Sequence, residues 1–130
     1  MLLVRTYVAP SPIHGLGLFA AEPIAAGTEM WRFQAGFDQI LAPELVEQLP
    51  AVAHGFIMIY AYLSPDFPGG YVLNGDQAIY INHSKSPNTD NSGPVTLAAH
   101  DIAAGEEITC DYDVCCLEHE LQGMSEAWDR

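Results

Sequence analysis

Basic side chains are scarce in this sequence. Only 4 lysine and arginine residues accompany 17 aspartate and glutamate residues, and the formal net charge is -13. A surface with this charge repels the phosphates of nucleic acids, so direct nucleic-acid binding is excluded as a function class. Two interpretations of the acidity stay open. It can attract basic peptides and speed their encounter, or it can only keep the protein in solution.

Long hydrophobic runs are also missing. No segment approaches the roughly 20 apolar residues that span a membrane, and the N-terminal stretch MLLVRTYVAPSP is too short and too soon interrupted for a signal peptide. The three cysteines, Cys110, Cys115 and Cys116, are odd in number and clustered, which does not describe a disulfide framework. We therefore expect a soluble cytoplasmic protein with no membrane partner.

Short strands separated by Gly and Pro turns dominate the pattern, and 130 residues suit one domain with one core. The fold class is therefore expected to be mainly β, with few short helices. We expect strands at 2–8, near 16–20, up to Phe33, and at 71–74, 78–82, 94–100 and 107–113.

Two segments could form helices. The stretch 42–50, APELVEQLP, is bounded by prolines and places carboxylates on its exposed positions, so it predicts a short helix. The apolar stretch 53–63 fits either a strand or a helix, because its length and β-branched content do not decide between them. The stretch 64–70, SPDFPGG, predicts a turn.

The first stretch that could form part of a binding site is HGLGLFA, at 14–20. Gly15 and Gly17 allow a backbone to approach a ligand closely or to adopt positive φ. It lacks the third glycine and the following helix of a dinucleotide-binding fingerprint. A tight turn between two strands explains the same residues.

The second stretch is INHSKSPN, at 81–88. An Asn side chain both donates and accepts hydrogen bonds, so Asn82 can recognise an amide-like or purine edge. His83 can serve as a general base or a metal ligand, but no His or Cys stands nearby at ligand spacing. The alternative is that Asn82 and His83 only cap a turn.

The third stretch is GEEITCDYD, at 105–113. Strand alternation would place Thr109, Asp111 and Asp113 on one face and Cys110 and Tyr112 on the other. An inward tyrosine beside a carboxylate is ordinary in β proteins, whereas a catalytic tyrosine needs its hydroxyl directed into a cavity.

The three stretches, taken in this order, resemble the SET domain, the family of S-adenosylmethionine-dependent protein-lysine methyltransferases. The family carries a GWG-like turn, an NHS…PN segment and a GEE-x-T-x-DY segment, and this chain resembles it from about Pro10 to Tyr112. The resemblance implies small curved sheets of the β-clip kind, in which the C-terminal segment passes beneath a preceding loop as a pseudoknot. We expect the SET domain at 1–112 and, at 113–130, a tail or helix that closes the site or forms a dimer interface.

Site residues follow from the same resemblance. The backbone around Gly15, Leu16 and Gly17 is expected to contact S-adenosylmethionine, which leaves as S-adenosylhomocysteine. Asn82 and the backbone of His83 are expected to hold the polar and adenine parts of that cofactor.

The catalytic side chains are also assigned by resemblance. Tyr112 matches the catalytic tyrosine, which orients the amine and the methyl group, and Tyr62 matches a second channel tyrosine. Cys110 occupies the substrate-channel position where the family places a Phe or Tyr that limits the number of methyl groups. Because cysteine is small, we expect room for di- or trimethylation.

The chain departs from the family pattern at the metal site. Lys85 stands where many members have a zinc-binding cysteine, and the tail offers Cys115, Cys116 and His119 without the required spacing, so no structural metal is expected. Lys85 either pairs with an acidic residue of the tail or is solvated. The tail at 113–130 then has to close the channel, by folding back or by packing on a second subunit of a homodimer.

Three function hypotheses result, the last of which is methylation of something other than a protein side chain. The first is methyl transfer from S-adenosylmethionine to a lysine amine of a basic protein. The second is a SET-fold interaction module that has lost turnover, and retention of Asn82, His83 and Tyr112 argues against it.

Overall fold

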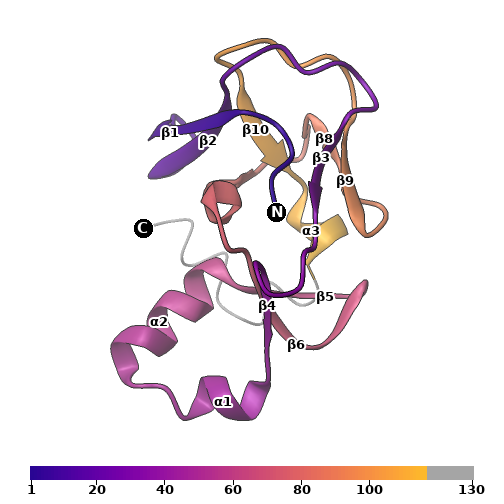
Figure 1. Cartoon of the computed structure of the whole chain (residues 1–130). Coiled ribbons are helices and arrows are strands. Elements are labelled where there is room, and N and C mark those ends of the chain that lie inside the picture. Colours follow the sequence, from indigo (N-terminus) through magenta and orange to yellow (C-terminus); the bar gives the residue numbers. More distant parts are fainter. Residues whose placement is uncertain (117–130) are drawn as a thin grey trace.

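The protein is described here by a computed structural model in which residues 1–116 are described. Among these residues, ten short strands form three small sheets, joined by three short α-helices and one 3₁₀ turn (Figure 1). The expectation of a mainly β fold with small sheets and few short helices is confirmed.

The first sheet has four strands in the order β1-β2-β10-β7. β10 pairs antiparallel with β2 on one side and parallel with β7 on the other. It therefore brings the late part of the chain between two much earlier segments. The strands are β1 (Thr6–Pro10), β2 (Leu16–Ala20), β7 (Asn82–His83) and β10 (Glu107–Cys110).

The other two sheets have three strands each, in the orders β3-β9-β8 and β4-β6-β5. In Figure 1 the β4-β6-β5 sheet lies with α1 and α2 at the opposite end of the molecule from β1 and β2. The strands are β3 (Glu29–Arg32), β4 (Gln39–Leu41), β5 (Tyr62–Ser64), β6 (Phe67–Leu73), β8 (Thr89–Asp90) and β9 (Val95–Ala98).

Two helices follow β4. The predicted helix at 42–50 is present as α1 (Pro43–Glu47), which has a proline at its first position. The segment that the pattern left undecided is helical, as α2 (Ala51–Tyr60). Pro50 is held near φ -54° and starts this helix, and Ile57 of α2 is buried in a small cluster with Val46 and Ala61.

Two segments differ from their predicted secondary structure. The predicted strand at 2–8 begins only at Thr6, and Leu2 forms an isolated bridge with Trp31 instead. The predicted turn at 64–70 is limited to Pro65 and Asp66, since Phe67–Gly70 already belong to β6.

The predicted strand at 78–82 is wrong. Gln77–Tyr80 form a 3₁₀ turn, η1, and only Asn82 and His83 are in strand β7. The cause is a side-chain cap, because the Asp76 carboxylate accepts a hydrogen bond from the Ala78 amide at 3.0 Å and so starts the turn.

The predicted strand at 107–113 ends at Cys110. The Asp111 carboxylate accepts from the Asp113 amide at 3.0 Å and caps α3 (Tyr112–Cys115). The expected alternation of faces therefore does not hold beyond Cys110, and Tyr112 takes its direction from the start of a helix.

The main core lies among the strands of the first two sheets and the loops between them. Its fully buried members are Leu18, Ala20, Ile24, Met30, Ala98, Ile102 and Ile108. A separate cluster surrounds Tyr112 and Cys110. Within residues 1–116, none of the helices has the length and apolar character needed to cross a membrane.

Candidate active site

Three sequence motifs meet at the β2-β10-β7 edge of the first sheet. The parallel register of β7 and β10 sets Asn82 opposite Thr109 and His83 opposite Cys110. The Ser84 amide adds a hydrogen bond to the Cys110 carbonyl at 2.9 Å. β2, which carries the glycines, pairs with the same β10 strand. The structure thus brings all three motifs together on neighbouring strands.

Asn82 is the centre of this meeting point and is 2% exposed. Its Nδ2 donates to the carbonyl oxygens of His14 at 3.0 Å and Leu16 at 3.3 Å, and to Glu107 Oε2 at 2.9 Å. Three acceptors share the two hydrogens of one amide. Asn82 therefore fixes the backbone of the glycine loop.

Glu107 holds the other side of the loop. Both of its carboxylate oxygens accept from the Ser11 hydroxyl, at 2.9 and 2.8 Å. The carboxylate passes over Gly17 so closely that a Cβ at position 17 would lie 3.0 Å from Ser11 Cβ and nearer still to Glu107 Oε2. Gly17 is thus required by packing within the protein.

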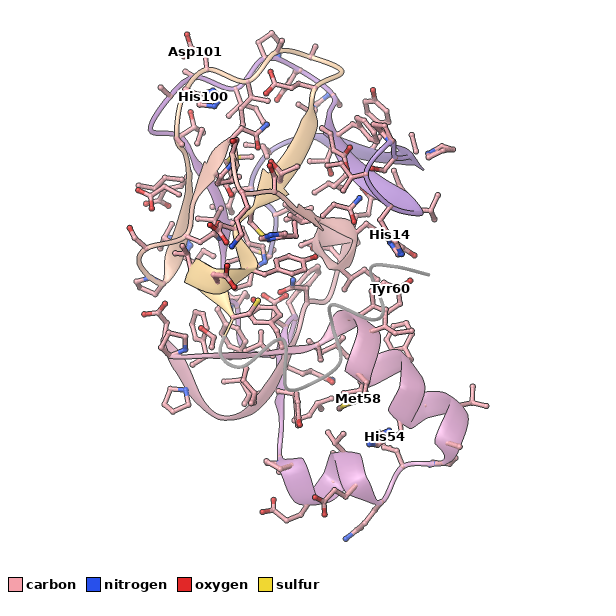
Figure 2. The ribbon with its side chains drawn as sticks, turned by 180° about the vertical axis from the view of Figure 1, so that it is seen from behind. His14, His54, Met58, Tyr60, His100 and Asp101 are labelled. Atoms are coloured by element: carbon pink, nitrogen blue, oxygen red, sulfur yellow. The ribbon has the colours of Figure 1, made fainter. Side chains whose placement is uncertain are left out.

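At position 15 glycine is favoured by the backbone conformation and not by packing. Its φ is +44°, in the left-handed region that favours glycine, and nothing lies within 4 Å of where its Cβ would be. Gly15 and Leu16 are exposed. The loop consequently presents backbone groups to open space, and Figure 2 shows His14 of this loop on the same edge of the view as Tyr60 at the end of α2.

His83 contacts Tyr112 in two ways. Its Nδ1 accepts a hydrogen bond from the Tyr112 backbone amide at 3.0 Å, and the two rings lie 5.1 Å apart at 46°. Because Nδ1 is the acceptor here, it carries no proton in this arrangement. Nδ1 also stands 3.9 Å from Asp111 Oδ1. The ring therefore helps to position the start of α3.

Tyr112 and Tyr62 share one buried cluster. The Tyr112 hydroxyl donates to the Ile81 carbonyl at 2.6 Å, and Tyr62 packs against the cluster of Cys110, Tyr112 and Cys116. Burial raises the pKa of both tyrosine hydroxyls well above their ordinary range, and the neighbouring thiols act in the same direction. Both side chains are therefore neutral phenols at physiological pH.

A pocket with a cavity volume of about 80 Å³ lies against this cluster. The described residues that line it include Tyr62, Tyr112 and Cys110, but none of Gly15, Leu16, Gly17, Asn82 or His83. The structure therefore separates the predicted site residues into two groups: tyrosines and a thiol at a pocket, and the glycine loop with Asn82 and His83 outside it.

Two polar atoms of the pocket lining have no hydrogen-bond partner among residues 1–116. They are Trp31 Nε1, a donor, and Asn74 Oδ1, an acceptor. Trp31 is 6% exposed. Since buried polar groups ordinarily find partners, the pocket offers a ligand one donor and one acceptor beside the phenols.

Lys85 lies beside two aspartates at the start of α3. Lys85 Nζ forms ion pairs with Asp113 and, at 3.7 Å, with Asp111, while its side chain stays 68% exposed. Within residues 1–116, no three His, Cys, Asp or Glu side chains are arranged to hold a metal ion. His119 and the rest of the predicted tail, 117–130, lie outside the described residues.

Sequence reasoning missed the residues that hold the site together. Ser11 and Glu107 are 96 positions apart, so no local pattern reports their bond. Asn88 entered the sequence analysis only as the end of the NHS…PN segment, yet its side chain accepts from the Thr109 amide at 2.9 Å and donates to Glu106 and to the Glu107 carbonyl. The only available signal was that Asn88 and Glu107 stand within the quoted motifs, whereas Ser11 does not.

A comparison with protein-family models matches residues 15–113 to the SET domain. The match covers most of the chain, so the chain belongs to the SET domain family and has the fold of protein-lysine methyltransferases. A comparison with curated proteins found no match.

Solved structures agree on the fold. A chain of the Chaetomium thermophilum Polycomb Repressive Complex 2, in a humanized mutant bound to the inhibitor GSK126, matches with a TM-score of 0.61 and 23% identity over 86% of this chain. An apo form of that complex, in an autoinhibited state, gives a TM-score of 0.65 and 20% identity over 95% of this chain. This chain spans 15% and 17% of those two chains.

A shorter protein matches over nearly its own whole length. It is a Plasmodium falciparum protein assigned as a histone methyltransferase, with a TM-score of 0.59 and 21% identity over 85% of this chain and 95% of that one. At these identities the structural matches define the fold, and the chemistry has to be argued from the residues of this chain.

Proposed function

We propose that this chain transfers a methyl group from S-adenosylmethionine to a lysine side-chain amine of a basic protein. The observation that carries the proposal is the arrangement on β7 and β10. β7 and β10 carry Asn82 and Glu107, which hold an exposed glycine loop, and β10 ends at Cys110, which lines a pocket together with two neutral tyrosines. Methyl donor and amine need two binding sites that meet, and this arrangement offers two.

The glycine loop fits a cofactor that binds through backbone groups. Gly15 faces open space, Leu16 is 47% exposed, and both lie at the turn that Asn82 and Glu107 hold in place. Asn82 directs its amide hydrogens to protein acceptors, so its proposed role at the cofactor site is to shape the loop around Gly15–Gly17. His83, beside it, is proposed to contribute its backbone and to hold Tyr112.

S-adenosylmethionine held at the Gly15–Gly17 loop would supply an electrophilic methyl group on a sulfonium for an amine nitrogen, with S-adenosylhomocysteine as the leaving product. The amine has to be neutral to attack, and a free lysine amine is charged below about pH 10.4. A pocket lined by Tyr62, Tyr112 and Cys110 disfavours the ammonium because burial penalises charge. The proton is proposed to leave to water before transfer, without a dedicated base.

Tyr112 and Tyr62 are proposed to align the amine. The Tyr112 hydroxyl donates its hydrogen to the Ile81 carbonyl, so toward an amine N–H its role is that of an acceptor. Alignment and fixed polar groups are the contributions that a methyl transfer requires from a protein. Cys110 leaves more space than a Phe or Tyr would, which supports di- or trimethylation.

The substrate is proposed to be a basic protein or peptide. The net charge of -13 attracts such a partner, and Trp31 Nε1 and Asn74 Oδ1 offer a donor and an acceptor in the pocket. A homodimer, with the 113–130 tail closing the site, stays part of the proposal, and light scattering on the full chain tests it.

Calorimetric titration of the full chain with S-adenosylmethionine and with S-adenosylhomocysteine tests the cofactor assignment. Saturable binding of both, weakened in Gly17→Ala and retained in Gly55→Ala, supports the proposal. Gly55 is suited as control because nothing lies within 4 Å of its would-be Cβ and it does not line the pocket. Absence of binding to the folded chain would leave the interaction-module hypothesis.

A further inference from the structure

Three free thiols lie side by side at one end of the pocket. Cys110 ends β10, and Cys115 and Cys116 follow at the end of α3, after the chain has reversed at the Asp111 cap. Cys115 Sγ stands 3.8 Å from Cys110 Sγ and 3.2 Å from Cys116 Sγ. The turn from strand to helix therefore brings thiols from two elements into contact.

The central thiol differs from its neighbours. Hydrogen bonding with both neighbouring thiols lowers the pKa of Cys115, whereas hydrogen bonding with Cys115 and burial raise the pKa of Cys110 and of Cys116. Cys115 is also only partly buried, whereas the other two are buried. A thiolate that small solutes can reach is the reactive form of cysteine.

We propose that Cys115 is a site of oxidation by peroxides and that the product is a reversible disulfide between Cys115 and Cys110. In the first step the Cys115 sulfur attacks a peroxide oxygen; an S–O bond forms, the O–O bond breaks and hydroxide leaves, so peroxide is reduced and sulfur becomes a sulfenic acid. In the second step the Cys110 sulfur attacks Cys115; the S–S bond forms, the S–O bond breaks, and the oxygen leaves as water with the Cys110 proton.

Cys110 is the partner because of geometry. A disulfide between the adjacent Cys115 and Cys116 would close a strained ring, although their sulfurs are the nearer pair. Cys110 and Cys115 belong to separate elements, and their sulfurs have to approach from 3.8 Å to about 2.0 Å. α3 has only four residues, so a small shift of its end is sufficient.

The consequence for activity depends on the proposed function. Cys110 and Cys115 line the same pocket as Tyr62 and Tyr112, and α3 begins at Tyr112. A bond that draws the end of α3 toward β10 moves Tyr112 and occupies part of the pocket. Oxidation is therefore expected to suppress methyl transfer by about 10²-fold, and a dithiol reductant restores it.

The test treats the full folded chain with hydrogen peroxide, blocks the remaining thiols by alkylation and maps the peptides by mass spectrometry. A Cys110–Cys115 crosslink with alkylated Cys116 is expected, and Cys116→Ser retains the crosslink. Cys115→Ser and Cys110→Ser lose the crosslink, and the ratio of methyl transfer before and after peroxide becomes about one in each variant.

Three thiols that all stay open to alkylation after peroxide overturn the inference, as does a Cys110–Cys116 crosslink that forms equally fast in Cys115→Ser. The crosslink is detected by mass spectrometry without an assay of methyl transfer, so either proposal can be overturned independently of the other. If peroxide produces the crosslink but the reduced chain transfers no methyl group, the oxidation site is retained and the proposed function is overturned.

Discussion

The Glu107 carboxylate lies directly over Gly17, in the space that a Cβ at position 17 would occupy. From there it reaches the Ser11 hydroxyl and the Asn82 amide, so one carboxylate ties β10 to the glycine loop and to β7. Because of this contact, even the addition of one methyl group at position 17 would disturb the loop.

Gly17→Ala is expected to displace Glu107 and to lower the free energy of unfolding by about 1–3 kcal/mol, the usual cost of overpacking a closed site. Urea unfolding measures the change. Gly93→Ala is the control, because its Cβ meets nothing within 4 Å. An equal effect of the two substitutions would contradict the role given to Glu107.

Asn82→Ala is expected to weaken cofactor binding as well as folding. It removes the amide from the carbonyls of His14 and Leu16, and the loss of an ordinary hydrogen bond costs about 0.5–1.5 kcal/mol. Asn88→Ala is the matched control, since Asn88 is 5% exposed and bonds to β10 and not to the loop.

Calorimetry with S-adenosylhomocysteine separates the two asparagines. Both variants are expected to unfold at lower urea, but Asn82→Ala alone should lose cofactor affinity by more than its stability loss explains. Equal affinity in the two variants would remove Asn82 from the cofactor site.

The buried tyrosines make stability depend on pH in the alkaline range. Burial raises the pKa of Tyr62 and of Tyr112, so the folded chain keeps both protons where the unfolded chain begins to lose them, at about pH 10. Above that pH the folded state binds more protons. The free energy of unfolding therefore falls with pH, by up to about 1.4 kcal/mol per unit for each tyrosine.

Urea midpoints measured from about pH 8 to about pH 11 check this dependence. The free energy of unfolding should decline towards the upper end, where the tyrosines titrate, and Tyr112→Phe should decline less steeply there than the parent chain. The same slope in both chains would show that Tyr112 does not titrate as proposed.

Lys85→Ala is expected to change the free energy of unfolding by less than about 1 kcal/mol. Lys85 pairs with Asp113 and Asp111, but its side chain is 68% exposed, and solvent and salt screen such pairs. Urea unfolding at low and high salt checks the expectation. A loss of several kcal/mol would mean that the pair holds α3 in place.

The mainly β fold could be predicted because its evidence is local. Gly and Pro turns separate short apolar runs along the whole chain, and the local sequence of each run predicts a strand or a helix. The errors fall where one side chain changes the backbone course. Asp76 turns 77–80 into a 3₁₀ turn and Asp111 ends β10, and neither carboxylate shows in its sequence context that it will act as a cap.

The site residues were named from motif resemblance, and the structure shows which of them lie together. The parallel pairing of β7 with β10 could not be derived from periodicity, because pairing partners far apart in the chain leave no periodic signal. Glu107 and Ser11 were missed for the same reason. The burial that keeps Tyr112 neutral depends on α3 and on Tyr62, so only three-dimensional packing reveals it.

Transfer of labelled methyl groups from S-adenosylmethionine to a set of basic proteins tests the central claim most directly, with the parent chain, Tyr112→Phe and Tyr7→Phe assayed side by side. Tyr7 is 41% exposed and outside the pocket, so it is the matched control. We predict label on lysine side chains that falls about 10²-fold in Tyr112→Phe and is unchanged in Tyr7→Phe. Equal labelling by all three folded chains, or none by a parent chain that binds the cofactor, would contradict the account.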